Sequence, residues 1–274
     1  MLKQRLLTAA VLVPLVVWAL LALDSAIVLL LFAAVAALAA WEWLSLMGLS
    51  IPVKVTVIAI IEAVIFAAVL YLPLTVALLA MALLWLLATL LIVRYAHQPL
   101  SPCLQRLFQS PLFGSVMALF VLSGFVLAAN AIHQYAEHGP ALLLYVMAIV
   151  WLADTGGYFA GKRYGKHRLA TAISPNKTWE GVAGALVLGS LWSIAFYYLL
   201  DDLAWPLMQW LALGCLAVLV SIVGDLFESV FKRCFDVKDS GQLLPGHGGI
   251  LDRIDSLLAA VPVFAVMLLG LGVL

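Results

Sequence analysis

The hydrophobic residues of this chain fall into long continuous runs separated by short polar stretches. Nine such runs can be counted, over residues 6–23, 26–46, 53–72, 75–94, 112–132, 141–161, 179–200, 204–232 and 252–273. Most are close to the roughly 20 residues that an α-helix needs to cross the hydrocarbon core of a bilayer. Polar and apolar residues do not alternate within them, which argues against membrane strands. The pattern therefore predicts an all-α fold, a polytopic bundle of about nine transmembrane helices.

The composition also indicates a membrane protein. Hydrophobic residues make up 66% of the 274 residues and the mean hydropathy is +1.17, whereas roughly half of a soluble domain is apolar. The first run follows Lys3 and Arg5 as in a signal peptide, but it is long and lacks a small-residue cleavage site, so we expect a retained helix. The run over 204–232 is too long for one span, so its end near 224–233 should leave the hydrocarbon or break.

The basic residues predict an orientation in the membrane. With a cytoplasmic N-terminus, the other cytoplasmic regions are the loops near 47–54, 94–111, 162–178 and 233–252. These regions and the adjoining helix ends hold all 14 Lys and Arg residues, whereas the opposite loops hold acidic residues and no Lys or Arg. Lys and Arg accumulate in cytoplasmic loops. We therefore expect the N-terminus in the cytoplasm and the C-terminus on the external side.

The chain divides into two regions of different character. Residues 1–111 should form scaffold helices, in which Glu42 and Glu62 are exceptions, each either a structural contact or part of a cavity lining. Residues 112–274 should form the catalytic region, because its two charged loops lie beside carboxylates within apolar runs. The three cysteines are scattered, which excludes a disulfide framework and argues against a zinc or iron–sulfur site.

The densest charge lies between Ser221 and Asp255, where six carboxylates and four Lys or Arg residues occur. A charge at the centre of a membrane helix costs roughly 2.5–3.5 kcal/mol, so such a cluster indicates a functional site. Asp225 and Glu228 are three residues apart, as are Asp252 and Asp255, so each pair shares a helix face. The two pairs could converge on a hard divalent cation such as Mg²⁺. Alternatively, Asp252 could complement the positive end of the last helix, but this does not explain Asp225.

A glycine-rich turn, which includes His247, Gly248 and Gly249, precedes the last helix. Glycines let backbone N–H groups approach a phosphate closely, and the N-terminus of the following helix attracts the anion. The alternative is an ordinary turn. The nearby Lys238 and Arg253 favour phosphate binding.

A second charged group comprises Asp154, the basic residues between Lys162 and Arg168, and the run Ser174-Pro-Asn-Lys177-Thr178-Trp-Glu180. This run has the pattern of a loop that enters a helix, with Thr178 as the N-cap. The basic residues either bind phosphates or serve topology and lipid headgroups, and Arg168 fits both interpretations equally. Carboxylates, a metal and lysines at the cytoplasmic membrane surface together imply a polyanionic substrate and phosphoryl or nucleotidyl transfer.

The C-terminal charged segment reads Ser229-x-Phe-Lys232-Arg233-x4-Lys238-Asp239-x-Gly-x2-Leu-Pro-x-His247-Gly248-Gly249-Ile-x-Asp252-Arg253-Ile-Asp255. This segment resembles the signature of the phosphatidate cytidylyltransferases, also called CDP-diacylglycerol synthases. Residues 154–181 are also similar to that family, with Asn176 where the family often has a lysine. The resemblance implies a magnesium-dependent enzyme of phospholipid biosynthesis that converts CTP and phosphatidate to CDP-diacylglycerol and pyrophosphate.

The resemblance also implies roles for individual residues. The expected metal ligands are Asp225, Glu228, Asp252 and Asp255. The expected catalytic residues are Asp225, Lys238, Asp252, Arg253 and Asp255. The expected substrate-binding residues are Asp154, Ser174, Lys177, Thr178, Glu180, Ser229, Lys232, Arg233, His247, Gly248 and Gly249.

Two other functions remain open from the sequence. A CTP-dependent lipid-alcohol kinase would use similar chemistry, and a cation-coupled transporter would also need intramembrane acids, although no polar path reaches the opposite face. The expected partners are CTP, phosphatidate and membrane lipid, without nucleic acid, and the chain could form a homodimer. The expected location is the inner membrane of a bacterium, with the active site facing the cytoplasm.

Overall fold

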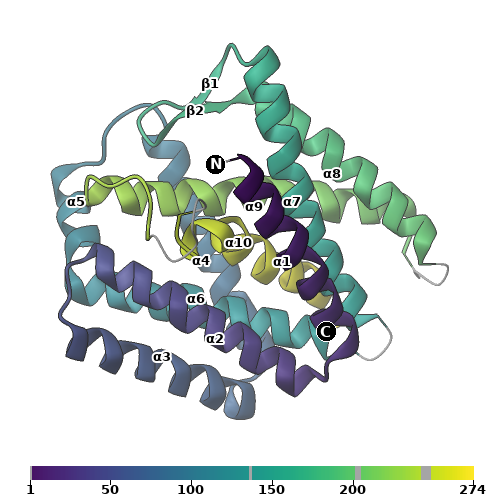
Figure 1. Cartoon of the computed structure of the whole chain (residues 1–274), viewed down its shortest axis with the longest axis horizontal. Helices are drawn as coiled ribbons and strands as arrows, with labels where there is room; N and C mark the ends of the chain where they lie inside the picture. Colours follow the sequence, from purple (N-terminus) through teal and green to yellow (C-terminus); the bar gives the residue numbers. More distant parts are fainter. Residues whose placement is uncertain (1, 136–137, 201–204, 242–247) are drawn as a thin grey trace.

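The computed structural model describes residues 2–135, 138–200, 205–241 and 248–274, with side chains from Ala10 onward. These residues form ten helices and one two-stranded sheet (Figure 1). The helices are α1 (Leu2–Ala22), α2 (Ser25–Leu46), α3 (Ile51–Tyr71), α4 (Leu74–Tyr95), α5 (Pro102–Gln109), α6 (Pro111–His133), α7 (Gly139–Tyr164), α8 (Trp179–Leu199), α9 (Leu207–Cys234) and α10 (Leu251–Gly270). The strands are β1 (Arg168–Ala170) and β2 (Ser174–Thr178).

The predicted all-α membrane bundle is confirmed. Each of the nine apolar runs corresponds to a helix, namely α1 to α4 and α6 to α10. Eight of these helices are long and apolar enough to cross a membrane. Of α1, the part with described side chains, Ala10–Ala22, is a shorter apolar helix. The orientation of the two termini stays a prediction.

Helix α5 lies in a stretch that the hydrophobic pattern assigns to a loop. Ser101 caps it, because its hydroxyl accepts a hydrogen bond from the backbone N–H of Leu104 at 3.4 Å. Pro102 occupies the start of the helix, where its missing N–H costs nothing. These are local signals, but the helix has only eight residues and no long apolar run.

The β-hairpin lies in the loop expected over 162–178. Its strands pair antiparallel, with Arg168 opposite Thr178 and Ala170 opposite Ser174. In Figure 1 the hairpin lies at one end of the molecule, beside the C-terminal end of α7. It orders a basic segment next to the start of α8.

Helix α9 is a single helix of 28 residues, so the break considered near 224–233 does not occur. At 1.5 Å per residue it is about 42 Å long. This is longer than the roughly 30 Å hydrocarbon core of a bilayer. The excess length lets its last turns carry the charged residues from Asp225 to Arg233 beyond the apolar segment.

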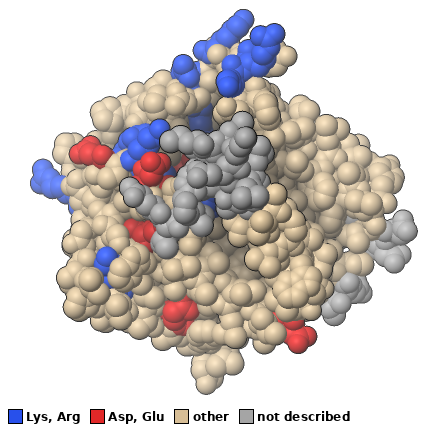
Figure 2. Space-filling model, in the orientation of Figure 1, with Lys and Arg blue, Asp and Glu red and all other residues tan. Residues whose placement is uncertain are grey.

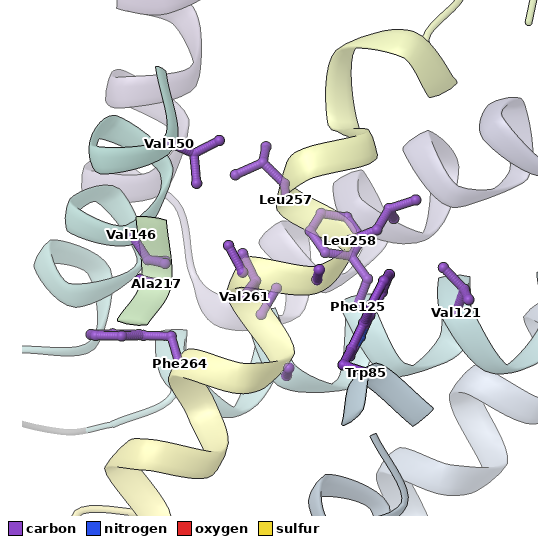
Figure 3. Close-up of a cluster of buried hydrophobic side chains, with 14 of the residues drawn as sticks. Trp85, Val121, Phe125, Val146, Val150, Ala217, Leu257, Leu258, Val261 and Phe264 are labelled. Carbon is purple, nitrogen blue, oxygen red and sulfur yellow. The ribbon is translucent and has the colours of Figure 1, made fainter. Parts of the chain in front are cut away.

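Helix α10 lies at the centre of the bundle (Figure 1). Figure 3 shows its side chains Leu257, Leu258, Val261 and Phe264 packed among buried residues of four other helices. These neighbours are Trp85 of α4, Val121 and Phe125 of α6, Val146 and Val150 of α7, and Ala217 of α9. The packing fixes the helix that carries Asp252 in its first turn and Asp255 one turn further on.

Helices α7 and α8 approach each other closely through glycines. A Cβ atom added to Gly156 would lie 2.4 Å from the carbonyl oxygen of Gly184, so neither the side chain of an alanine nor anything larger fits there. Small residues allow such backbone contact between membrane helices. The contact places Asp154 of α7 beside the segment that enters α8.

Candidate active site

A pocket of about 680 Å³ lies between α7, α8, α9 and the hairpin. This volume falls in the range of about 300–1,000 Å³ that is common for ligand sites. Its charged lining residues are Asp154, Lys162, Arg168, Lys177 and Asp225. Apolar residues such as Ala153, Val182 and Ile222 complete the lining. The pocket thus combines cations, acids and an apolar wall.

The start of α8 positions the basic side of this pocket. Thr178 is the N-cap, as expected, and its hydroxyl accepts a hydrogen bond from the N–H of Gly181 at 3.1 Å. The preceding residue, Lys177, extends from β2 into the pocket. Glu180 lies on the other side of the turn, where it accepts hydrogen bonds from the backbone N–H groups of Lys166 and His167. Glu180 therefore holds the hairpin to α8 and does not line the pocket.

Lys177 and Asp225 join the hairpin to α9. The lysine Nζ lies 2.5 Å from Oδ2 of the aspartate, and the two side chains are 25% and 29% exposed. Asp154 is close enough to Lys177, Asp225 and Arg253 to interact with their charges. A ligand in the pocket would therefore meet a lysine that is already held in place by an acid.

A second cluster of charges surrounds Lys232. Its Nζ lies 2.5 Å from Oε2 of Glu228 and donates a hydrogen bond to Oδ1 of Asp252 at 2.8 Å. All three side chains are buried or nearly so, with exposed fractions of 12%, 2% and 9% for the lysine, the glutamate and the aspartate. Lys232 therefore neutralises two carboxylates from two helices. The sequence had suggested a phosphate ligand at this position.

Asp252 also organises the segment before α10. Its Oδ2 accepts hydrogen bonds from the N–H groups of Gly249 at 2.9 Å and Ser240 at 3.1 Å. Gly248 adopts φ +81°, a conformation that suits glycine, and a Cβ there would lie 2.9 Å from Oδ2 of Asp252. The N–H of Gly249, which was expected to face a phosphate, is thus bonded within the chain.

Asp255 connects the two clusters. It lies within the electrostatic reach of Asp225, Glu228 and Asp154. A Cβ added to Gly224 would lie 2.5 Å from the carbonyl oxygen of Asp255, so α9 and α10 are in close contact at this point. Asp225, Glu228 and Asp255 therefore lie near the contact between α9 and α10. The convergence of all four acids on one metal ion stays a prediction.

The carboxylate oxygens near this contact are of the type that Mg²⁺ prefers as ligands. Oε1 of Glu228 is buried and has no hydrogen-bond partner among the described residues. Within that same part of the chain, however, no three Asp, Glu, His or Cys side chains are arranged around one point as metal ligands. The oxygens of Asp252 are already engaged by Lys232, Ser240 and Gly249. The metal site stays a prediction, for which Asp225, Glu228 and Asp255 are the better candidates.

The remaining predicted residues lie at the edges of the two clusters or away from them. Ser229 donates a hydrogen bond to Oδ1 of Asp225 at 3.4 Å. Arg233 donates to the carbonyl oxygen of Ile173 at 3.4 Å and lines a smaller pocket of about 150 Å³. Lys238 and Arg253 are exposed. Ser174 begins β2 without lining the larger pocket, and His247 lies outside the described residues.

Three residues that were not among the expected site residues line the larger pocket, namely Lys162, Arg168 and Asn176. Figure 2 shows basic side chains gathered over the hairpin and the adjoining end of α7, while most of the remaining visible face is uncharged. Their charge did not distinguish basic residues that line the pocket from those that only set the orientation in the membrane, because both kinds occur in one short basic segment.

A family model described as the cytidylyltransferase family matches residues 3–271. The chain belongs to this family. It is 41% identical to the phosphatidate cytidylyltransferase of Pseudomonas aeruginosa over 99% of its own length and 98% of that protein. It is 37% identical to the protein of the same name from Haemophilus influenzae, over 97% and 98% of the two chains. A Staphylococcus aureus phosphatidate cytidylyltransferase is 45% identical over 139 residues, about half of each chain.

Proposed function

We propose that this protein is a phosphatidate cytidylyltransferase of the membrane, which makes CDP-diacylglycerol and pyrophosphate from CTP and phosphatidate. The observation that carries the proposal is the large pocket, which has basic and acidic side chains and an apolar wall between membrane helices. A nucleoside triphosphate and a phospholipid together require these features. Relatives of that name match nearly the whole chain, which supports the same activity.

In this reaction an oxygen of the phosphatidate phosphate attacks the α-phosphorus of CTP. A new P–O bond forms, the bond between the α-phosphorus and the bridging oxygen breaks, and pyrophosphate leaves with that oxygen. The attacking phosphate is already ionised, so little general-base catalysis is needed. The task of the protein is to bring two anions together and to neutralise the charge that develops on the leaving group.

The basic pocket residues suit this task. Lys177 is oriented by Asp225, and Lys162 and Arg168 add positive charge on the hairpin side. The apolar wall formed by α8 and α9 suits the glycerol and acyl portion of a lipid that arrives from the bilayer. We therefore assign the triphosphate to the hairpin side and the lipid to the side of the helices.

Magnesium is part of the proposal. Asp225, Glu228 and Asp255 would hold it, with Asp252 supporting the neighbouring segment. A bound Mg²⁺ would supply charge neutralisation at the phosphates.

A product assay tests the proposed function directly. Purified protein in mixed micelles of detergent and phosphatidate, with Mg²⁺ and α-labelled CTP, should yield labelled CDP-lipid and unlabelled pyrophosphate. Formation of lipid phosphate and CDP would instead identify a lipid-alcohol kinase. Cation-coupled flux into proteoliposomes without either product would identify a transporter.

We predict that the hairpin and the segment before α10 both face the cytoplasm of a bacterial cell. In a variant whose native Cys103, Cys215 and Cys234 are replaced, cysteines at Lys166 and Asp239 should resist a membrane-impermeant maleimide until the membrane is opened. Cysteines introduced at positions 137 and 202 should react from outside. Reaction of the first two positions from opposite sides would contradict the nine-helix topology.

Among the basic residues, we expect the pocket position to determine the kinetic effect. Lys177→Ala should lower kcat/KM for CTP by about tenfold or more, the loss typical of a hydrogen bond to a charged group. Arg168→Ala should raise the KM for CTP by a smaller factor. Arg168 lines the pocket, but among the described residues no acid forms an ion pair with it that would fix its orientation. Arg163→Ala is the control, since Arg163 is exposed outside the pocket lining. Equal losses in all three variants would indicate a general surface field.

A further inference from the structure

Glu42 is a buried carboxylate near the end of α2, far in sequence from the candidate site. Its exposed fraction is 3%. Within the described part of the chain it has no ion pair with a lysine, arginine or histidine. Burying a carboxylate is costly unless its oxygens accept hydrogen bonds. The contacts that it does make therefore indicate why it is there.

Glu42 caps α10 from a different helix. Its Oε2 accepts a hydrogen bond from the backbone N–H of Leu251, the first residue of α10, at 2.8 Å. The N-cap residue of α10 is Ile250, whose side chain cannot accept such a bond. The first N–H groups of a helix lack partners within the helix, and a negative charge beside them is stabilising. Glu42 thus supplies the acceptor that the local sequence does not contain.

The segment before α10 also closes around the same carboxylate. The hydroxyl of Ser240 donates to Oε2 of Glu42 at 3.4 Å. Cβ atoms added to Gly241 and Gly249 would each lie 2.4 Å from an oxygen of this carboxylate. Two glycines of the signature are therefore needed for close approach to Glu42. Its Oε1 is buried and has no partner among the described residues.

The contact continues into the candidate site. Ser240 donates its backbone N–H to Asp252, and Asp252 accepts from Lys232, which also contacts Glu228. A series of polar contacts thus connects Glu42 of α2, through Ser240 and Asp252, to Lys232 and Glu228 of α9. Leu251, which Glu42 holds, directly precedes Asp252.

We infer that Glu42 is a positioning residue, which holds Ser240, Gly249 and the first turn of α10 in place for the reaction. The inference rests on the proposed nucleotidyl transfer and extends it, because it gives a residue of the N-terminal helices a role in the active site. Glu42 acts through Leu251 and Ser240 and not on the substrates themselves.

Glu42→Ala tests this role, with Glu62→Ala as the matched control. Glu62 is a second glutamate within a membrane helix, α3, and it lies in neither charged cluster. We expect Glu42→Ala to lower the rate of CDP-lipid formation by about ten- to a hundredfold, as for loss of a charge-assisted hydrogen bond. Glu42→Gln keeps an oxygen that can accept from Leu251, so its rate should lie between those of Glu42→Ala and wild type. Glu62→Ala should stay close to the wild-type rate.

Hydrogen exchange provides a readout that does not depend on activity. In Glu42→Ala, peptides that span 248–256 should exchange faster, while peptides from α6 and α7 should exchange as in wild type. Unchanged exchange over 248–256, or a rate equal to that of Glu62→Ala, would overturn the inference. If Glu42→Ala does not fold, Glu42→Gln decides: slower turnover with faster local exchange supports the role, and wild-type behaviour in both refutes it. A wild-type protein that makes no CDP-lipid would refute the proposed function alone, because the exchange measurement would still report on Glu42.

Discussion

Replacing Asp225 by asparagine should lower the rate of CDP-diacylglycerol formation by at least about a hundredfold, which corresponds to about 2.7 kcal/mol of transition-state stabilisation. Asp225 both lines the large pocket and belongs to the group of acids at the crossing of α9 and α10. Asparagine keeps the size of the side chain but removes the negative charge that orients Lys177. The loss of an anionic ligand should also raise the Mg²⁺ concentration needed for half-maximal rate.

Asp236→Asn is a suitable control for this experiment. Asp236 is exposed shortly after α9 and adopts φ 53°, a conformation that asparagine tolerates well. The same chemical change at this position should leave the rate near that of wild type. Both variants need to be monodisperse in detergent before their rates are compared over a range of Mg²⁺. A folded Asp225→Asn enzyme that is as fast as Asp236→Asn at low Mg²⁺ would contradict the role of Asp225.

The helices of this fold were predictable because the bilayer imposes a length and a composition on each span. Every long apolar run became a helix, and the charged end of α9 stands out since it follows about 20 apolar residues. Helix α5 and the hairpin were not predicted, because each is short and lies in a polar stretch. Local capping at Ser101 and Thr178 is readable from the sequence, but strands of three and five residues are too short to show a period-two pattern.

The candidate site was predictable in its membership more than in its contacts. The three-residue spacing predicts that each pair of acids on α9 and α10 shares a helix face, and Asp225, Glu228 and Asp255 are close enough to interact electrostatically. Spacing within one helix gives no information on partners from other helices. The contacts of Lys232 with Glu228 and Asp252 were therefore not predicted, and its expected contact with substrate stays a prediction. The contact of Glu42 with Leu251 spans 209 positions and has no local signature.

Lys232 should also be the charged residue whose removal costs the most stability. Its side chain is 12% exposed and contacts Glu228 and Asp252, whose side chains are 2% and 9% exposed. Replacing it by methionine would leave Glu228 and Asp252 without a cation in a poorly solvated site. Breaking a buried ion pair from one side typically costs about 3–5 kcal/mol. We therefore expect Lys232→Met to lower the melting temperature in detergent clearly, and activity to fall with it.

A double-mutant cycle separates this charge effect from lost packing. Glu228→Gln removes one of the two uncompensated charges, so the double variant Glu228→Gln, Lys232→Met should melt at a higher temperature than Lys232→Met alone. Residues in direct contact show coupling energies of roughly 0.5–3 kcal/mol in such cycles. Lys238→Met provides the control, since Lys238 is exposed and its replacement should change the melting temperature little. Additive effects of the two single changes would show that Lys232 contributes mainly through its apolar stem, and the ion-pair assignment would then be wrong.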